Sequence, residues 1–474
     1  MKKKIVSEII RNSKISFGTS GARGLVTDFT AEVCVAFTLA FIKVMQQQFD
    51  FNKLAIAIDN RPSSSNIAAA CISAAKALDI QVDYYGVIPT PALAVTSMSD
   101  YIPAIMITGS HIPFDRNGLK FYRPDGEINK TDEVAILTSD TEFIDFTIMT
   151  LPLVSKRAAN AYVARYINIF RNDSLKGKRI GVYEHSSAGR DLYSGLFQRL
   201  GAQVICLGRS EHFIPIDTEA VCQSDIDMAV AWRNEFKLDA IFSTDGDGDR
   251  PLLSDEIGNY LRGDILCLLA AKILKIDTLA VPVNCNSAIE RCGSFAKVMR
   301  TKIGSPYVIA AFDNLKKVSN SRVAGFEANG GFLLGTDINV NGVVLNSLPT
   351  RDALLPALAV LTSLGSASIS ELVTDLPRIY TASDRIKNFE RCKSLEIISA
   401  GLVDPNGLLI QLGLNDFDII SIDNTDGLRI TLDSGDVVHL RPSGNAPELR
   451  CYAESSSQKC ALKLVKKVLN NILF

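Results

Sequence analysis

The 474-residue chain has little net charge and no long hydrophobic run. Its 50 lysines and arginines nearly balance 52 aspartates and glutamates, which leaves a formal charge of −2. A nucleic-acid or membrane partner would require a clustered basic excess, so we expect neither. No apolar stretch approaches membrane-spanning length, and Ser7 and Glu8 interrupt the apolar region that a secretory signal would need after the basic start. We therefore expect a cytoplasmic protein.

Cysteine pairs with metal-binding spacing are also missing. The ten cysteines are scattered without one Cys-x-x-Cys pair, which argues against structural zinc and against a disulfide framework. We expect them to be reduced, mostly as small core residues. The chain is 47% hydrophobic and 22% charged, as globular proteins are. Its length allows roughly three or four domains.

An aspartate-rich loop follows a β-type run at residues 239–244. Residues 245–250 read Asp-Gly-Asp-Gly-Asp-Arg, so Asp245, Asp247 and Asp249 alternate with two glycines. Glycine lets the backbone curl until the three carboxylates converge on one cation, and such oxygen ligands suit Mg²⁺. Phosphate is the first candidate for the group that this cation neutralises, and Arg250 adds a planar cation suited to phosphate or carboxylate.

Three other interpretations of this loop are weaker. An EF-hand would use Glu256 at position twelve, but its sixth position requires glycine where this chain has Arg250. A haloacid-dehalogenase-type phosphatase also places Asp-x-Asp after a strand, with the first aspartate as nucleophile. That interpretation leaves the third aspartate and the serine loop described next unexplained. A solvated acidic turn gives no reason for three like charges to lie together.

A serine loop lies upstream. A buried strand is expected at residues 103–108, and Gly-Ser-His-Ile-Pro follows at residues 109–113. Ser110 would then stand at a strand's carboxyl end, where open α/β sheets bind ligands, and His111 could orient or protonate a group on its oxygen. Nothing resembles the Gly-x-Ser-x-Gly elbow of acyl-transfer hydrolases. We expect a turn at residues 117–118 and then a strand carrying Lys120.

Two further loops combine polar side chains with glycine. Residues 325–331 read Gly-Phe-Glu-Ala-Asn-Gly-Gly, and the carboxylate of Glu327 with the amide of Asn329 suits sugar hydroxyls. Residues 441–447 read Arg-Pro-Ser-Gly-Asn-Ala-Pro, which offers a guanidinium, a hydroxyl, an amide and backbone N–H groups. That set would hold a phosphate.

Strand and helix patterns alternate along most of the chain. They predict three consecutive α/β domains, at residues 1–150, 151–262 and 263–377, with mixed, largely parallel sheets. A C-terminal α+β domain follows at residues 378–474. Helices are expected at 31–49, 66–78, 264–275, 306–317 and 458–473, and strands at 54–59, 103–108, 179–184, 203–208, 240–244, 278–284, 417–423, 428–432 and 437–440.

Taken in chain order, the motifs resemble the α-D-phosphohexomutase superfamily, which includes phosphomannomutases and phosphoglucomutases. The matching pieces are residues 17–24 (Phe-Gly-Thr-Ser-Gly-Ala-Arg-Gly), 108–113, 245–250, 325–330 and 441–447. The resemblance implies four domains around a central cleft and a serine that is phosphorylated at rest. One of its phosphate oxygens would complete the Mg²⁺ shell.

Carried over motif by motif, the resemblance implies a role for each site residue. Ser110 would be the phosphoserine and, with Asp245, Asp247 and Asp249, a metal ligand. Arg23 and Lys120 would flank the transferring phosphoryl group, with His111 beside the serine. The substrate-binding residues would be Glu327 and Asn329 for the sugar, Arg441, Ser443, Gly444 and Asn445 for the other phosphate, and Arg250.

The activity implied by this resemblance is interconversion of hexose 1-phosphate and hexose 6-phosphate. Mannose phosphates are the first choice of substrate and glucose phosphates the second, with a hexose 1,6-bisphosphate as intermediate and activator. The partner would be this small molecule, bound to a monomer or homodimer. A Mg²⁺-dependent phosphosugar phosphatase and a catalytically dead phosphosugar sensor are the alternatives.

The chain departs from the family pattern in places. Many bacterial members have Gly-Glu-x-Ser-Gly-His in the sugar loop, whereas Asn329 and Gly331 replace the serine and histidine here. Ala446 stands where threonine is common, and Gly109 where alanine is usual. The missing histidine is a proposed proton-transfer group in the family, so the identity of the general acid–base residue in this chain is an open question. Lys120 is the candidate replacement.

Overall fold

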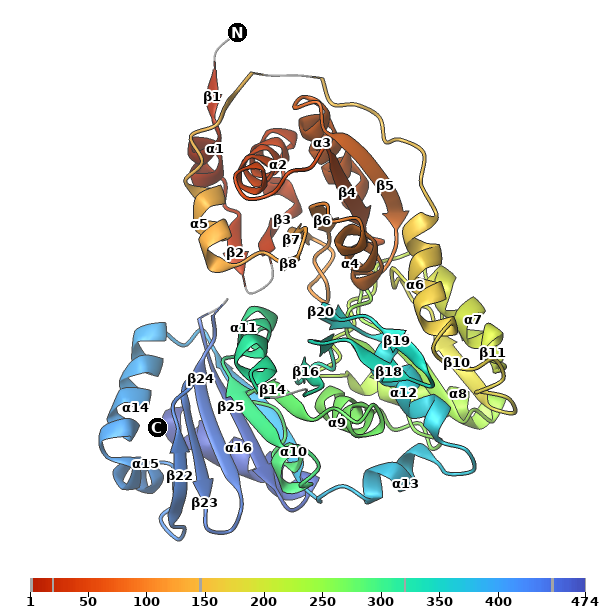
Figure 1. The fold of residues 1–474 in the computed structure, drawn as a ribbon. Helices are drawn as coiled ribbons and strands as arrows, with labels where there is room; N and C mark the ends of the chain where they lie inside the picture. Colours follow the sequence, from red (N-terminus) through yellow and green to blue (C-terminus); the bar gives the residue numbers. More distant parts are fainter. Residues whose placement is uncertain (1–2, 19–20, 145–146, 319–320, 445–446, 474) are drawn as a thin grey trace. The chain divides into compact units, whose positions relative to one another are not determined.

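The computed structural model describes residues 3–18, 21–144, 147–318, 321–444 and 447–473 (Figure 1). The chain divides into two compact units, one formed by Met1–Lys275 with Asn329–Ser370 and the other by Ile276–Ala328 with Glu371–Phe474. Within the described part of the chain, no helix is long and apolar enough to cross a membrane.

The first sheet of the first unit joins a parallel half to an antiparallel half. β4 pairs in parallel with β5 and β6, whereas β7 runs antiparallel to β6 and to β3. In spatial order the strands are β2 (Ser16–Gly18), β3 (Gly21–Leu25), β7 (Arg116–Arg123), β6 (Ala104–Ile107), β4 (Lys53–Ile58) and β5 (Gln81–Val87), with β8 (Gly126–Glu127) on β7. A separate short pair joins β1 (Lys4–Ile5) and β9 (Glu142–Phe143).

Helices cover both faces of this sheet. The larger side chains of β4, Leu54, Ile56 and Ile58, share a core with α2 and α3, which lie together on one face (Figure 1). Thr30 caps α2, because its hydroxyl accepts a hydrogen bond from Val33 N. The helices are α1 (Val6–Asn12), the 3₁₀ turn η1 (Val26–Asp28), α2 (Ala31–Gln46), α3 (Ser64–Lys76), α4 (Thr90–Ser99) and α5 (Lys130–Leu137).

The turn that we predicted at residues 117–118 is wrong, because both residues lie inside β7. A Cβ at Gly118 would lie 2.8 Å from the carbonyl oxygens of Ala22 and Thr108, so glycine there permits close packing of the neighbouring chain segments. Lys120 lies opposite Met106 of β6. The lysine therefore projects from the middle of the sheet and does not follow a turn.

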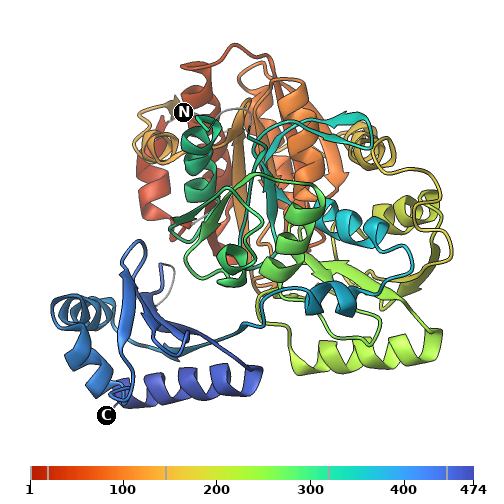
Figure 2. The ribbon, with the colours of Figure 1, turned by 60° about the horizontal axis from the view of Figure 1, so that its bottom comes forward.

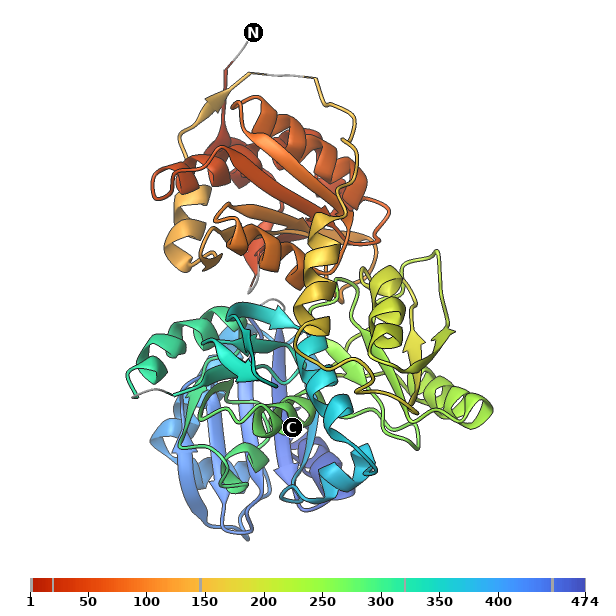
Figure 3. The ribbon, with the colours of Figure 1, turned by 45° about the vertical axis from the view of Figure 1, so that its right-hand side comes forward.

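A second, smaller sheet of the first unit carries the aspartate loop. β10 lies between β11 and β12, parallel to both, and β13 pairs antiparallel with β12. Helices α7 and α8 lie beside these strands (Figure 3). The elements are α6 (Arg157–Ile167), β10 (Arg179–Tyr183), α7 (Arg190–Arg199), β11 (Gln203–Leu207), α8 (Gln223–Phe236), β12 (Ala240–Thr244) and β13 (Pro251–Leu253).

The rest of the first unit comes from the third expected domain. β17 pairs antiparallel with β20, and the hairpin of β18 and β19, which the sequence analysis did not predict, lies between them in sequence. The elements are α9 (Gly263–Ile273), β17 (Phe332–Leu334), β18 (Ile338–Val340), β19 (Val343–Leu345), β20 (Leu348–Asp352) and α12 (Leu354–Ser363), followed by α13 (Ile369–Thr374), which crosses into the second unit.

The second unit contains three parallel strands and the C-terminal antiparallel sheet. β14 (Thr278–Pro282) pairs in parallel with β15 (Lys297–Thr301) and β16 (Val323–Phe326), and α10 (Ala288–Arg291) and α11 (Ser305–Lys316) lie in the connections. The C-terminal strands run in the order β21 (Tyr380–Lys387), β25 (Glu448–Ser455), β24 (Val437–Pro442), β23 (Leu428–Leu432) and β22 (Ile419–Asp423). α14 (Arg391–Val403), α15 (Pro405–Gln411) and α16 (Gln458–Leu473) share one hydrophobic core with that sheet (Figure 2).

The predicted fold class is confirmed: successive α/β parts have mixed sheets, and the C-terminal part has an antiparallel sheet. The sequence analysis missed β21 and β25, which pair along their full lengths although 60 residues lie between them. The proposed domain boundaries and the central cleft stay predictions.

Candidate active site

The serine loop begins where β6 ends. Ser110 has φ = 56°, in the left-handed region that residues other than glycine rarely adopt. Its backbone N–H donates to Thr108 Oγ1 at 2.7 Å, and its hydroxyl donates to Asp245 Oδ2 at 2.6 Å. These bonds hold the buried hydroxyl against the aspartate loop, although the two residues are 135 positions apart in sequence.

A buried arginine that the sequence analysis missed holds the serine loop in place. Arg61 follows β4, and its guanidinium donates to Ser110 O (2.8 Å), Ile112 O (2.6 Å), Pro113 O (2.6 Å), Arg116 O (2.9 Å) and Asp59 Oδ2 (3.0 Å). A Cβ at Gly109 would lie 2.6 Å from Arg61 Cζ, so glycine leaves room for the guanidinium. The only local signal was a charged pair, Asp59 and Arg61, directly after a buried strand.

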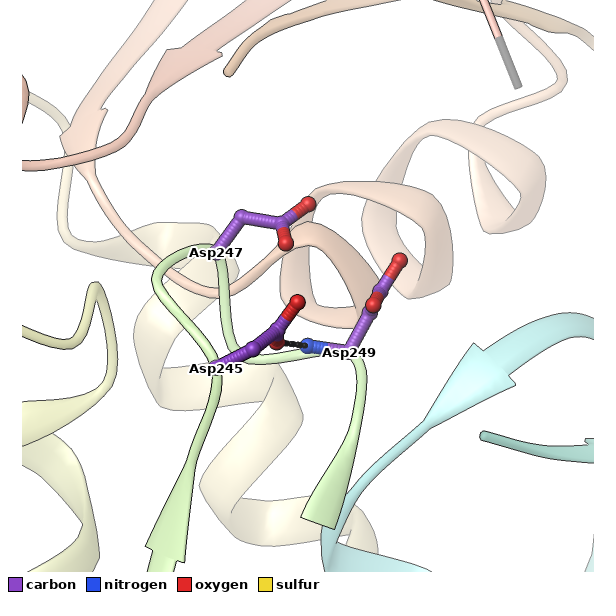
Figure 4. Close-up of side chains that lie close together, drawn as sticks. All are labelled: Asp245, Asp247 and Asp249. Carbon is purple, nitrogen blue, oxygen red and sulfur yellow. Dashed lines mark hydrogen bonds between the residues drawn. The ribbon is translucent and has the colours of Figure 1, made fainter. Parts of the chain in front are cut away.

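The three aspartates of the loop after β12 are buried and point toward a common space (Figure 4). One ligand oxygen from each lies within 4.8 Å of the others. Asp245 Oδ1 accepts from the backbone N–H groups of Asp249 and Arg250, each at 3.2 Å. These bonds fold the loop back on itself.

Neighbouring side chains donate hydrogen bonds to one carboxylate oxygen of Asp247 and to one of Asp249. Asp247 Oδ2 accepts from Lys120 Nζ at 2.5 Å and from Thr90 Oγ1 at 2.6 Å. Asp249 Oδ2 accepts from Lys120 Nζ at 2.7 Å and from Arg351 Nε at 3.0 Å. The second oxygens, Asp247 Oδ1 and Asp249 Oδ1, are buried and accept no hydrogen bond from any described residue.

This donor set fits a hard divalent cation. Buried carboxylate oxygens that accept no hydrogen bond are costly unless a cation compensates them. Burial, and then the charges of Asp247 and Asp249, raise the pKa of Asp245 well above its usual value. Burial also opposes ionisation of Asp247, but Lys120 and Thr90 outweigh it and lower its pKa. A bound cation would stabilise the ionised form of all three carboxylates.

His111 is neutral in this arrangement. Arg250 Nη1 donates to His111 Nδ1 at 3.0 Å, so the ring proton belongs on Nε2, and Ser110 Oγ lies 3.4 Å from the same Nδ1. Burial, and then the charges of Arg250 and Arg23, lower the pKa of His111 to about 2. Arg23, on β3, has its own pKa lowered to about 10 by burial and then by Arg250 and Arg351, so it keeps its charge at neutral pH.

The sugar loop spans the boundary between the two units. Glu327 is buried in the second unit, whereas Asn329 belongs to the first. Asn329 Oδ1 accepts from Gly331 N at 3.0 Å, and its backbone oxygen accepts from Thr218 Oγ1 at 2.8 Å. We predicted that the amide of Asn329 binds sugar, but its oxygen stabilises the turn of its own loop.

The predicted phosphate loop lies at the end of β24 in the second unit. Arg441 Nε donates to Asp426 Oδ2 at 2.8 Å, which fixes the guanidinium beside the loop. Ser443 is buried and its carbonyl accepts from Arg391 at 3.3 Å, whereas Gly444 is exposed. Asn445 lies outside the described residues. The structure thus brings the serine, the aspartates and their cationic neighbours together in the first unit, and the phosphate loop belongs to the second.

Three stretches of the chain match models of one protein family. Residues 14–156 match the phosphoglucomutase/phosphomannomutase alpha/beta/alpha domain I, residues 262–380 match alpha/beta/alpha domain III, and residues 378–471 match the C-terminal domain. The chain belongs to this phosphoglucomutase/phosphomannomutase family, as the resemblance predicted.

Individual relatives are similar over nearly the whole chain. The phosphomannomutase of Salmonella muenchen is 57% identical over 98% of this chain and 97% of its own length. The phosphomannomutase of Sinorhizobium fredii is 42% identical over 96% of this chain and 98% of its own length. A crystal structure of a "putative phosphomannomutase" from Thermus thermophilus covers 97% of this chain and 99% of its own, with a TM-score of 0.77 and 18% identity, which shows a shared fold.

Proposed function

We propose that the protein is a phosphomannomutase that moves a phosphoryl group between the 1- and 6-hydroxyls of mannose through Ser110. The observation that carries the proposal is the hydrogen bond from the Ser110 hydroxyl to Asp245 of the buried aspartate cluster. A phosphoryl group on that oxygen would lie beside the candidate cation site. The phosphomannomutases at 57% and 42% identity support mannose as the sugar.

The proposed reaction uses the serine oxygen twice. Phosphorylated Ser110 gives its phosphoryl group to the free hydroxyl of a hexose monophosphate, which forms a 1,6-bisphosphate. After the sugar reorients, the other phosphoryl group returns to the serine oxygen. Positioning and electrostatics supply most of the catalysis in phosphoryl transfer, and the charges available here come from Lys120, Arg23 and Arg250. Mg²⁺, where bound by the aspartates, would neutralise charge on the phosphoryl oxygens.

We also propose roles for the recognition loops. Glu327 and Asn329 would bind sugar hydroxyls, and Arg441, Ser443, Gly444 and Asn445 would bind the non-reacting phosphate. Arg441 supports this role, because Asp426 already orients its guanidinium. Glucose phosphates are the second choice of substrate. A Mg²⁺-dependent phosphatase would use the same cluster but would release inorganic phosphate without needing a bisphosphate activator.

The decisive experiment is a pair of coupled assays. Mannose 1-phosphate and glucose 1-phosphate are supplied separately, each with a catalytic amount of its 1,6-bisphosphate, and formation of the 6-phosphate is followed. We expect a higher kcat/KM for mannose 1-phosphate and no release of inorganic phosphate. Phosphate release without sugar 6-phosphate would favour the phosphatase.

The phosphoserine assignment has its own test. Purified protein should contain a fraction heavier by one phosphoryl group in intact-mass measurement, and Ser110→Ala should lose both that fraction and mutase turnover. Ser363→Ala, which changes a serine at the end of α12, should keep both. Full turnover in Ser110→Ala would contradict the assignment.

A further inference from the structure

Arg351 is one of the largest fully buried side chains in the described structure, and it reaches the aspartate loop from β20. Its Nε donates to Asp249 Oδ2 at 3.0 Å. Asp249 therefore receives hydrogen bonds from two cations, Arg351 and Lys120, on the same oxygen. The other oxygen, Oδ1, accepts no hydrogen bond from any described residue, although Arg250 Nε lies 3.7 Å from it.

Gly331 makes room for this arginine. A Cβ built at Gly331 would lie 2.5 Å from both Cγ and Cδ of Arg351, closer than real Cβ contacts come. Gly331 is not among the glycines with positive φ, so its backbone does not require glycine. The close approach of the arginine stem is the physical reason that the structure gives for glycine at this position.

We propose that Arg351 is a positioning residue: it fixes the Asp249 carboxylate so that Oδ1 faces the cation site, and Gly331 admits it. This inference rests on the cation site of the proposed function. Carboxylates that bind metals are commonly oriented by hydrogen bonds to their other oxygen. Arginine suits this task better than lysine, because its planar guanidinium donates in a fixed direction.

Two roles for Arg351 predict opposite effects of its removal. If it were only a counter-charge, removing it would leave Asp249 more negative toward a cation, and Mg²⁺ binding would tighten. If it positions the carboxylate, removing it lets the side chain rotate toward Lys120, and Mg²⁺ binding weakens. The sign of the change in affinity therefore separates the two roles.

The experiment is calorimetric titration of Mg²⁺ into the full chain. Arg351→Ala, Arg351→Lys and Gly331→Ala should each weaken Mg²⁺ affinity by about 10- to 100-fold, the usual cost of losing a partner that orients a ligand. In the Arg351→Ala background, Gly331→Ala should cause no further loss, because the side chain that it displaces is already gone. Circular dichroism and the thermal midpoint show whether each variant folds.

Matched controls come from the same unit. Arg165→Ala removes another arginine, whose Nη2 donates to Asn346 O, and Gly195→Ala adds a Cβ on α7 where no atom lies within 4 Å. Both should bind Mg²⁺ as the unmodified protein does. Unchanged or tighter binding in folded Arg351→Ala or Arg351→Lys would overturn the proposal, as would a lack of Mg²⁺ binding in the unmodified protein. If the variants change Mg²⁺ affinity as expected but the unmodified protein does not interconvert hexose phosphates, the proposed function is refuted and the role of Arg351 is not.

Discussion

Lys120 shows how one buried side chain connects two parts of the site. Its ammonium group lies between Asp247 Oδ2 and Asp249 Oδ2, and its side chain is 5% exposed. As the ammonium, a lysine in that position neutralises carboxylate charge; to act as a base it would first have to lose a proton, and only the neutral amine could take the proton that the attacking sugar hydroxyl releases. The neutral His111 is less suited to take this proton, because its Nδ1 accepts from Arg250, and burial and then Arg250 lower its pKa to about 2.

Lys120→Arg separates these two roles, because arginine keeps the charge but cannot act as a base at neutral pH. We expect kcat to fall at least about 10²-fold, the lower end of the range for general acid–base catalysis, with KM little changed. Steady-state kinetics on the preferred hexose phosphate gives both values. A near-normal kcat would leave Lys120 as a counter-charge only, and His111→Gln would then be measured.

At the scale of elements, the serine loop and the aspartate loop are stabilised in different ways. The aspartate loop is closed by its own backbone, whose N–H groups donate to Asp245. The serine loop depends on Arg61, which comes from another strand end and stacks at 4.0 Å from the centroid of the Phe213 ring. Its left-handed Ser110 is strained backbone that the surrounding contacts must maintain.

Loss of Arg61 should therefore affect both stability and turnover. Arg61→Met removes the guanidinium that donates to four carbonyl oxygens and pairs with buried Asp59, and breaking a buried ion pair costs about 3–5 kcal/mol. We expect a lower thermal midpoint and slower phosphorylation of Ser110, measured by intact mass after incubation with hexose 1,6-bisphosphate. Arg322→Met, which breaks the partly exposed pair with Asp277, is the control. A variant with normal phosphorylation would show that the serine loop holds its conformation without Arg61.

The aspartate loop predicts dependence on a divalent cation. Chelation should abolish turnover, and added Mg²⁺ should restore it. Asp247→Ala should lose activity while remaining folded. It removes a carboxylate whose Oδ1 accepts no hydrogen bond from the described residues and would bind the cation. Asp191→Ala, an exposed aspartate on α7, should behave as the unmodified protein. Equal activity with Ca²⁺ would contradict a Mg²⁺ site, because Ca²⁺ favours more flexible shells with more ligands.

At the scale of the whole molecule, two buried histidines link folding to pH. His185 donates from Nε2 to Thr244 O in the first unit, and His439 donates from Nε2 to Asp426 O in the second. Burial is the main cause that lowers the pKa of each to about 4 from 6.5, and Arg190 and Arg429 respectively add to it. The folded protein therefore binds fewer protons than the unfolded chain between these values.

The free energy of unfolding should then be independent of these two histidines above pH 6.5. It should fall as the pH decreases toward 4, by up to about 3 kcal/mol for each histidine. Thermal midpoints measured at about pH 7, 6, 5 and 4.5 span this range and test the prediction. His185→Gln and His439→Gln should each flatten the decline, whereas the exposed His212→Gln should not. A decline of the same steepness in both buried-histidine variants would assign acid sensitivity to other groups.

The sequence by itself determined the fold class, the family and the candidate chemistry. Local patterns were sufficient where a short segment carries its own signal. The apolar period of α2 is such a signal, and so is the alternation of aspartate and glycine at residues 245–249. Loops after buried strands could be identified as sites because ligands bind at the carboxyl ends of strands in α/β sheets.

Only the tertiary structure decided which distant residues act together. Ser110 meets Asp245 across 135 positions, and Arg351 meets Asp249 across 102. No local pattern marks such pairs, because strand order and loop closure bring them together. The same holds for Gly109 and Gly331, which as sequence were only departures from a family pattern. In the structure each glycine leaves room for a buried arginine, since a Cβ at either position would overlap the side chain.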